Sequence, residues 1–276
     1  MDKELNNGIV CYQGLPYSYS ESAARAMFVD KTLIHKETFG DVFREVHEGR
    51  ADIGVVPLEN STAGHVQEVY DLLMEYDLYI NYSYIKKVDH CLAGIRDGEL
   101  KDVKEIYSHP QALMQCREFI KENGYMSKNE INTAVAAKKV CEMNNKNAAC
   151  ICSVEAAENY GLKILKENIN SAKLNYTRFG AISKKLDTKQ DHNRVSIVFT
   201  VPHEVGTLHE VMSIFAQNNV NLSYIYSRPD VGSPWKYLFY MDFEENILKP
   251  EIQAILERMK KELPIMKILG SYRLVQ

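Results

Sequence analysis

Short apolar runs alternate with helical patterns from residue 8 onward. GIVCYQG (8–14) and ADIGVVPLEN (51–60) have the length and composition of strands, and GDVFREVHEG (40–49) between them repeats apolar residues at helical spacing. A strand–helix rhythm of this kind is typical of a sheet covered by helices. The pattern therefore predicts an α/β fold for this part of the chain.

A second set of the same kind follows. LYINYSYIKKVDHCLAGI (78–95) predicts one long or broken strand, QALMQCREFIKENG (111–124) predicts a helix that ends at Gly124, and LKILKENI (162–169) predicts a strand. We expect two lobes, one at about 8–84 plus 162–183 and the other at 85–161. A ligand would lie in the cleft between them.

A polar segment then divides the chain. Residues 184–193, KKLDTKQDHN, are polar apart from Leu186 and show no periodicity, which indicates a linker. Beyond it the strand and helix patterns follow the order βαββαβ, as in a ferredoxin-like domain. We therefore predict a first domain at 1–183 and a second at 194–276.

Composition and charge narrow the class of function. The net charge of -4 over 276 residues gives no electrostatic reason to expect nucleic acid or an acidic membrane. The six cysteines form no CxxC pair and no metal-ligand spacing, so they predict reduced thiols. The charged start MDKELNNGIV and the lack of a long apolar run predict a cytoplasmic protein whose partners are small molecules or copies of itself.

Four polar clusters follow the expected strands, where open α/β sheets place their sites. They are QGLPYSYSE (13–21), PLENSTAGHV (57–66), SHPQALMQ (108–115) and NYTRF (175–179). Each also has a purely structural explanation. Ser20 and Glu21 could cap and open a helix, while the Asn-Ser-Thr row at 60–62 could form a turn or hold a carboxylate.

A histidine and an arginine in these clusters could likewise have either a structural or a functional role. His109 has no acidic neighbour in sequence and fits a structural role as well as an acid–base role. Arg178 lies between aromatic residues in a strand-like segment, so its guanidinium needs an anion, either a protein carboxylate or a ligand. Nothing resembles a Ser-His-Asp set, a HExxH helix or a phosphate-binding loop.

Taken together, the motifs resemble the prephenate dehydratase family over almost the whole chain. YQGLPYSYSESAA, PLENSTAGHV, SHPQALMQC and the Thr-Arg-Phe segment occur in that family's order, and the tail is similar to an ACT regulatory domain. The resemblance implies a two-lobed fold like that of periplasmic binding proteins, followed by a ferredoxin-like βαββαβ ACT domain. It also implies the decarboxylating dehydration of prephenate to phenylpyruvate, without a cofactor.

The resemblance assigns roles to residues. Thr177 would give a hydrogen bond or a proton to the departing ring hydroxyl, and Phe179 would supply an apolar wall. Arg178 would either clamp a carboxylate or support the loop from behind. The residues that would orient the substrate are Asn60, Ser61, Thr62, Ser108 and Gln115.

The ACT-like tail implies feedback control by phenylalanine, which in the family binds between regulatory domains of paired subunits. A homodimer or homotetramer is therefore expected. The implied effector residues are Gly206, Thr207 and Leu208 on one side, and Asn221, Leu222 and Ser223 on the other. Three aromatic residues depart from the family pattern: Tyr17 replaces a usual Gly, Tyr224 a common Lys and Tyr226 a usual Glu.

Two rival interpretations remain. One is an arogenate dehydratase, whose substrate carries an amine beside the side-chain carboxylate. The other is a non-catalytic amino-acid-responsive binding protein, since two lobes with a cleft also describe ligand sensors. No chorismate mutase segment precedes residue 8, so a monofunctional enzyme is expected.

Overall fold

The computed structural model describes residues 8–172, 174–229 and 237–275, which form two compact units. The first unit takes residues 8–72 and 85–179, and the second takes 73–84 and 180–275. Residues 1–7, 173, 230–236 and 276 of the two predicted domains lie outside the described residues.

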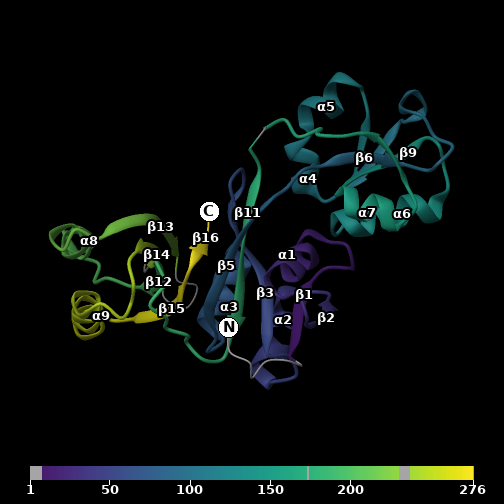
Figure 1. Cartoon of the computed structure of the whole chain (residues 1–276). Helices are drawn as coiled ribbons and strands as arrows, with labels where there is room; N and C mark the ends of the chain where they lie inside the picture. The colour runs from purple at the N-terminus through teal and green to yellow at the C-terminus, as the bar shows by residue number, and fades with distance from the viewer. Residues whose placement is uncertain (1–7, 173, 230–236, 276) are drawn as a thin grey trace. The chain divides into compact units, whose positions relative to one another are not determined.

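The first lobe of the first unit is built on parallel strands (Figure 1). β1 (Ile9–Gln13) pairs in parallel with β2 (Thr32–Lys36) and with β3 (Ile53–Asn60), and β11 (Tyr176–Ser183) lies beside β3. The short β4 (Gly64–His65) turns back on β3. The helices are α1 (Tyr19–Met27), α2 (Phe39–Glu48) and α3 (Gln67–Glu75). This is the predicted α/β arrangement.

The start of α1 differs from the sequence prediction. Its N-cap is Ser18, whose Oγ accepts from the Glu21 N–H at 3.3 Å, and Ser20 lies inside the helix. The preceding Tyr17 has φ 68°, in the left-handed region that glycine adopts most easily. The departure noted at Tyr17 thus lies at a position whose backbone favours glycine, and the turn there places the cap two residues earlier than expected.

The second lobe has its own five-stranded sheet, in the order β10-β6-β9-β7-β8. The strands are β6 (Cys91–Gly94), β7 (Glu105–Ser108), β8 (Met126–Asn129), β9 (Ala148–Cys152) and β10 (Lys163–Lys166), and a 3-10 turn covers Leu100–Asp102. One face packs on α4 (Pro110–Gln115) and α5 (Arg117–Glu122), the other on α6 (Thr133–Met143) and α7 (Val154–Asn159). Since β9 is buried on both faces, it is apolar throughout.

Two local predictions for this lobe were wrong, and one strand was not predicted. The helix expected at 111–124 breaks at Cys116, where ψ 17° leaves the helical region, and gives α4 and α5. β8 was not predicted, because all four of its residues are exposed and carry no apolar alternation. β10 pairs with β6 in the second-lobe sheet, so the chain returns to the first lobe after Lys166 rather than near residue 162.

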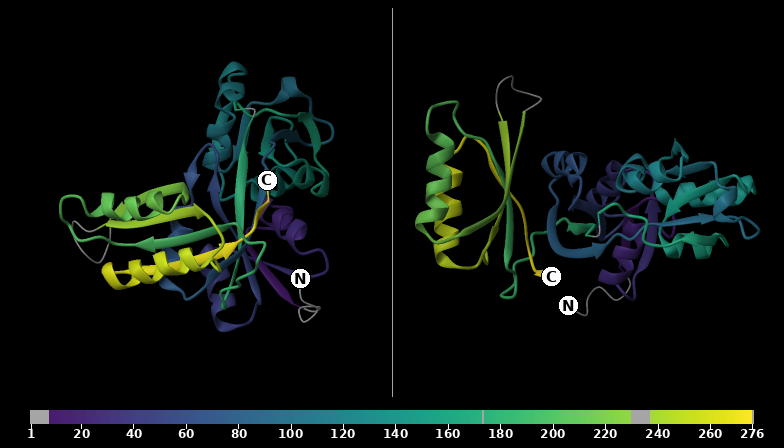
Figure 2. Two further views of the ribbon diagram at one scale, coloured as in Figure 1. Left: turned by 60° about the vertical axis from the view of Figure 1, so that its left-hand side comes forward. Right: turned by 90° about the horizontal axis from the view of Figure 1, so that it is seen from above.

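The second unit confirms the predicted βαββαβ order. Its elements are β12 (Arg194–Phe199), α8 (Thr207–Gln217), β13 (Asn221–Pro229), β14 (Tyr237–Glu244), α9 (Pro250–Glu262) and β15 (Met266–Tyr272). Both helices cover one face of the sheet (Figure 2), where Phe215, Phe243 and Leu256 pack in the core. β5 (Tyr79–Lys87) extends this sheet beside β15, and β16 (Leu274–Val275) also pairs with β5.

The predicted linker has no helix or strand, but it is tied to the second unit. Asn246 Nδ2 donates to the carbonyl oxygens of Lys189, Gln190 and His192 at 2.7, 3.2 and 2.8 Å. The compact units divide at Phe179 and Gly180, a few residues before the linker. The domain boundary at 184–193 stays a prediction.

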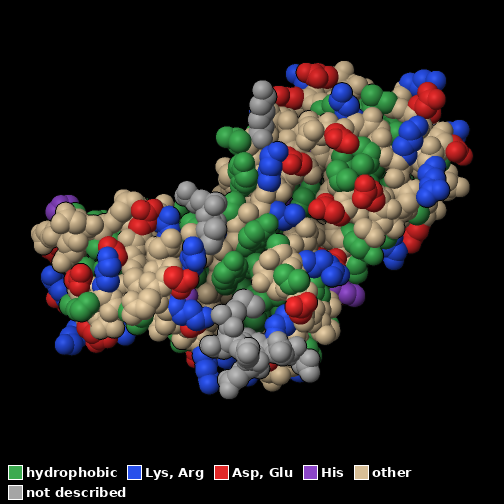
Figure 3. All heavy atoms as spheres, in the orientation of Figure 1, with side chains coloured by type: hydrophobic (Ala, Val, Ile, Leu, Met, Phe, Trp, Pro, Cys, Tyr) green, Lys and Arg blue, Asp and Glu red, His purple; other side chains and the backbone are tan. Residues whose placement is uncertain are grey.

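Charged side chains lie on the surface (Figure 3), whereas most cysteines lie inside the protein. In Figure 3, acidic and basic side chains are interspersed on the visible face. All six cysteines are described and free, and five are buried. Within the described ranges, no helix is long and apolar enough to cross a bilayer, and no group of His, Cys, Asp or Glu side chains forms a metal site.

Candidate active site

A cavity of about 410 Å³ lies between the two lobes of the first unit. Its wall combines the β1–α1 turn, the end of β3, the start of α4 and the start of β11, as the cleft expectation required. None of its described lining residues is Asp, Glu, Lys or Arg. The polar side chains on the wall are Gln13, Ser18, Tyr19, Ser20, Asn60, His90, His109, Gln111, Gln115, Asn132, Thr133 and Thr177.

Strand alternation places Thr177 and Phe179 together on the cavity wall. Both line the cavity and are largely buried, while Arg178 between them points to the opposite face of β11. Ser61 fixes this strand beside β3: its N–H donates to the Tyr176 carbonyl at 2.8 Å, and its Oγ accepts from the Tyr176 N–H at 3.0 Å. Ser61 therefore supports Thr177 and does not line the cavity.

The amide of Asn60 has one defined orientation. Its Oδ1 accepts from the backbone N–H groups of Thr62 and Ala63 at 3.0 and 3.1 Å, and backbone nitrogens can only donate. Nδ2 must then be the donor to Thr177 Oγ1 at 3.0 Å and to Asn175 Oδ1 at 2.8 Å. Because Thr177 accepts from Asn60, its own proton is available to a ligand in the cavity.

Gln115 and His90 continue this network. Gln115 Nε2 lies 2.7 Å from Thr62 Oγ1 and 3.2 Å from Asn60 Oδ1, and its Oε1 lies 2.9 Å from His90 Nε2. Thr62 and Gln115 thus both donate to Asn60 Oδ1 and hold the amide in place. On the other side of the His90 ring, Nδ1 lies 3.1 Å from the Tyr19 hydroxyl.

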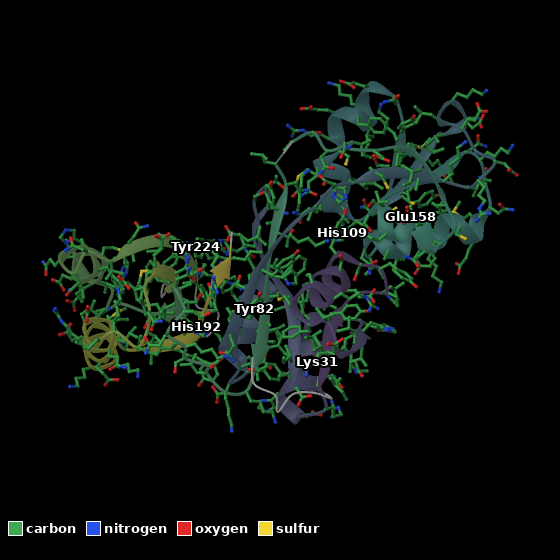
Figure 4. The ribbon with its side chains drawn as sticks, in the orientation of Figure 1. Lys31, Tyr82, His109, Glu158, His192 and Tyr224 are labelled. Carbon is green, nitrogen blue, oxygen red and sulfur yellow. The ribbon has the colours of Figure 1, made fainter. Side chains whose placement is uncertain are left out.

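Burial sets the protonation of both cavity histidines. His90 is 2% exposed, and burial lowers its pKa against a smaller opposing effect of Gln115 and Asp89. Burial also lowers the pKa of His109, which lies at the beginning of α4 (Figure 4) and whose Nδ1 accepts from the Gln111 N–H at 3.2 Å. Both rings are therefore neutral at pH 7 in the unliganded protein.

Four predicted substrate ligands are not on the cavity wall: Ser61, Thr62, Ser108 and Arg178. Ser108 is fully buried and its Oγ donates to the Ile151 carbonyl at 2.7 Å, which ties β7 to β9. The guanidinium of Arg178 pairs with Glu59, with Nε and Oε2 3.3 Å apart. The anion that meets this arginine is a protein carboxylate, and His65 lies 3.5 Å from the other oxygen of Glu59.

A second cavity, of about 310 Å³, lies in the ACT-like unit. Gly206, Thr207 and Leu208 line it, and Gly206 has φ 92°, which a side chain would strain. The residues predicted for the opposite side do not line it: Asn221 is exposed, Leu222 packs against the core, and Ser223 Oγ donates to the Asp242 carbonyl. One chain therefore brings together only half of the predicted effector set.

Sequence reasoning missed His90 and Tyr19 on the cavity wall. His90 lies in the short connection between β5, which ends at Lys87, and β6, which begins at Cys91. It was missed because 78–95 was interpreted as one long or broken strand, and the position of the break was not located. Tyr19 belonged to the predicted cluster at 13–21 but was not singled out.

Comparison with known families follows the same division of the chain. A model of the prephenate dehydratase family matches residues 10–187, and a model of the ACT domain matches residues 195–263. The prephenate dehydratase of Methanocaldococcus jannaschii is 37% identical over 96% of this chain and 98% of its own. Arogenate dehydratase/prephenate dehydratase 1 of Arabidopsis thaliana is 33% identical over 95% of this chain and 71% of its own.

Two solved structures share the fold of nearly the whole chain. Prephenate dehydratase from Arthrobacter aurescens in complex with L-Phe has a TM-score of 0.88 at 27% identity, and the match covers 96% of this chain and 90% of that one. GqqA, described as a novel type of quorum quenching acylase, has a TM-score of 0.87 at 32% identity, over 97% and 98%. The expected fold class, a two-lobed α/β domain of the periplasmic-binding-protein type with an ACT domain, is confirmed. The chain belongs to the prephenate dehydratase family.

Proposed function

We propose that this chain is a prephenate dehydratase, a hydro-lyase that converts prephenate to phenylpyruvate with loss of CO2 and water. The observation that carries the proposal is the Thr177 hydroxyl, whose oxygen accepts from Asn60 and whose proton is free for a ligand in the cavity. Prephenate needs such a donor because its ring hydroxyl must leave as water. Aromatisation of the ring makes the elimination favourable, and the proposal includes no cofactor.

Placement, not acidity, gives Thr177 its effect. A threonine hydroxyl is a poor acid, so it acts on a leaving oxygen that becomes basic only in the transition state. Asn60 holds the Thr177 hydroxyl and is itself held by Thr62. Asn60 and Gln115 orient the substrate, and Phe179 supplies the apolar wall. Ser61 and Ser108 support the cavity from behind, and Arg178 stabilises the sheet through Glu59.

The substrate is a dicarboxylate, and helix ends supply part of the positive potential that it requires. α1 and α6 begin at the cavity, with Ser18 and Asn132 as their caps. Helix amino termini favour a nearby anion by about 0.3–1 kcal/mol each. This supports a cavity for an anionic ligand although its described wall lacks Lys and Arg.

We further propose feedback control by L-phenylalanine at the second cavity. Gly206, Thr207 and Leu208 would hold one side of the amino acid. Asn221, Leu222 and Ser223 of a second copy would complete the other side, which requires a homodimer or homotetramer. The L-Phe complex of the Arthrobacter relative supports this effector. The proposal also includes a catalytic domain at 1–183, a linker at 184–193, an ACT domain at 194–276 and a cytoplasmic location.

The deciding experiment is an absorbance assay for phenylpyruvate formed from prephenate, run on the full chain with and without L-phenylalanine. We expect turnover that phenylalanine reduces. Thr177→Ala should lower kcat by about 10²–10⁴-fold, the scale of one positioned proton donor. Near-wild-type turnover in that variant would remove Thr177 from the mechanism. Calorimetric titration without phenylalanine binding would refute the regulatory half alone.

The same assay separates the alternatives. The Arabidopsis relative's name includes arogenate, so kcat/KM should be compared for prephenate and arogenate. An acylase activity like that in GqqA's description would need an activated nucleophile. Within the described cavity wall, no hydrogen bond joins a Ser or Thr hydroxyl to a histidine. Binding without any turnover would favour the non-catalytic sensor.

A further inference from the structure

A dianionic substrate raises a question of charge in this cavity. The described wall holds no Lys or Arg, and the guanidinium of Arg178 is paired with Glu59 on the opposite face of the sheet. The side chains on the wall that can become cations are His90 and His109. If the cavity binds prephenate as proposed, one of these two histidines can carry the positive charge.

The hydrogen-bond network fixes the proton on one nitrogen of His90. Backbone N–H groups assign Asn60 Oδ1 as an acceptor, and Thr62 Oγ1 donates to it at 2.7 Å. The Thr62 oxygen then accepts from Gln115 Nε2, so Gln115 Oε1 must face His90. An amide oxygen can only accept, and His90 Nε2 must therefore carry a proton.

The other ring nitrogen has a place for a second proton. The Tyr19 hydroxyl lies 2.6 Å from the Asp89 carbonyl, to which it donates, and 3.1 Å from His90 Nδ1. When the ring is neutral, Nδ1 is bare and competes with Asp89 for the single Tyr19 proton. When the ring is protonated, Nδ1–H donates to the Tyr19 oxygen and every group in the row is satisfied without a change of geometry.

We propose that His90 is the residue that supplies positive charge for the substrate, by taking up a proton from solvent when the dicarboxylate enters the cavity. The imidazolium then donates to Gln115 and Tyr19 and faces the bound anion. His109 is less suited to this role, because its Nδ1 already accepts from the Gln111 N–H and protonation there would break the helix cap. The cavity wall thus gains a positive charge only when an anion arrives.

The groups around His90 allow this uptake. Asp89 of the same loop favours the imidazolium, although it is paired with Lys87 at 3.0 Å. Burial raises the pKa of Tyr19 on α1, so the phenol stays neutral. The thiols near Tyr19 also stay neutral, since burial raises the pKa of Cys116 to about 12 and the pKa values of Cys91 and Cys152 are raised as well.

The sign of the pH dependence follows from the two states. In the free enzyme, burial lowers the pKa of His90 below its ordinary value, and a dianion in the cavity raises it again. Binding between these two pKa values requires one proton from solvent. In this window kcat/KM for prephenate should fall about tenfold for each unit of rising pH, while kcat stays constant.

The test compares two histidine variants across this pH range. His90→Gln keeps a nitrogen donor toward Gln115 but cannot become cationic, so its kcat/KM should be lower and independent of pH. His109→Gln should keep the wild-type slope. A His90→Gln enzyme with the wild-type slope would overturn the proposal, as would a wild-type enzyme without a slope.

A binding measurement makes the result independent of turnover and of the folding of the His90 variant. Prephenate is titrated into the Thr177→Ala enzyme by calorimetry in two buffers of different ionisation enthalpy, which reports the protons taken up. Uptake approaching one proton per site supports the proposal, and heat independent of the buffer overturns it. A wild-type enzyme that binds prephenate without forming phenylpyruvate would instead refute the proposed function.

Discussion

Replacing Asn60 by Asp turns one donor into an acceptor and leaves the shape of the side chain unchanged. In the wild type, Asn60 Nδ2 donates to Thr177 Oγ1 at 3.0 Å, so the threonine proton points to the ligand. The new carboxylate would keep its bonds to the Thr62 and Ala63 N–H groups through one oxygen. The other oxygen would accept the threonine proton, and the substrate would lose its donor.

The size of the effect follows from that lost proton. A positioned general acid contributes about 10²–10⁴-fold, which corresponds to about 2.7–5.4 kcal/mol of activation free energy. We expect kcat to fall by this factor. KM should rise as well, because the new charge repels a dicarboxylate and faces Asn175 Oδ1, 2.8 Å from Nδ2 in the wild type.

The assay is phenylpyruvate formation by the single variants and by the double variant with Thr177→Ala. If Asn60 acts through the threonine proton, Asn60→Asp should have little further effect on kcat once that proton is gone. Gln111→Glu is a matched control, since it brings the same charge to the cavity wall and should act mainly on KM. A full additional loss of kcat in the double variant would show that the orientation argument is wrong.

Further predictions concern the supports of the site and the ACT domain. Glu59→Gln removes the carboxylate that pairs with the Arg178 guanidinium and should cost about 1–3 kcal/mol of stability, with KM unchanged. A large rise in KM without loss of Tm would instead indicate that Arg178 binds the substrate. Gly270→Ala places a Cβ 2.3 Å from the Ile80 carbonyl oxygen and must force β15 from β5, so its loss in denaturant unfolding should exceed that of Gly206→Ala, which meets no atom of the described residues within 4 Å and costs backbone strain of about 1–2 kcal/mol. Asn246→Ala removes the donor to three linker carbonyls and should speed proteolysis within 184–193, and an unchanged cleavage rate would mean that the linker is held by other contacts.

Much of the fold was predictable because its strands and helices differ in period. β9 is apolar at every position and α6 is not, which the sequence shows directly. Elements without such a pattern were missed: the exposed β8 has no apolar residue but Met126, and the break at Cys116 depends on a single backbone angle. The sheet partner of β10 depends on contacts distant in sequence, so no local signal could supply it.

The residue types of the site were predictable from the sequence, but the directions in which the side chains point were not. The polar clusters at strand ends contain Asn60, Thr62, Gln115 and Thr177, and the resemblance to the family assigned roles to them. All four line or support the cavity network. Ser108 belongs to the same motif, yet its hydroxyl points to a neighbouring strand. A motif is a stretch of consecutive residues, but only the side chains on one face of an element reach the cavity. Which face that is depends on how the strands pair in the sheet.

The Thr-Arg-Phe segment makes this dependence concrete. Alternation along β11 requires Thr177 and Phe179 to share one face and Arg178 to take the other, whichever face that is. The neighbouring β3 decides the choice, because it presents Asn60 on the cavity face and Glu59 on the opposite face. A slip of one residue between the strands would place the guanidinium beside Asn60 and leave the hydroxyl against Glu59. The bonds of Ser61 to Tyr176 hold the register that avoids this, so a residue outside the cavity determines which chemistry the cavity can perform.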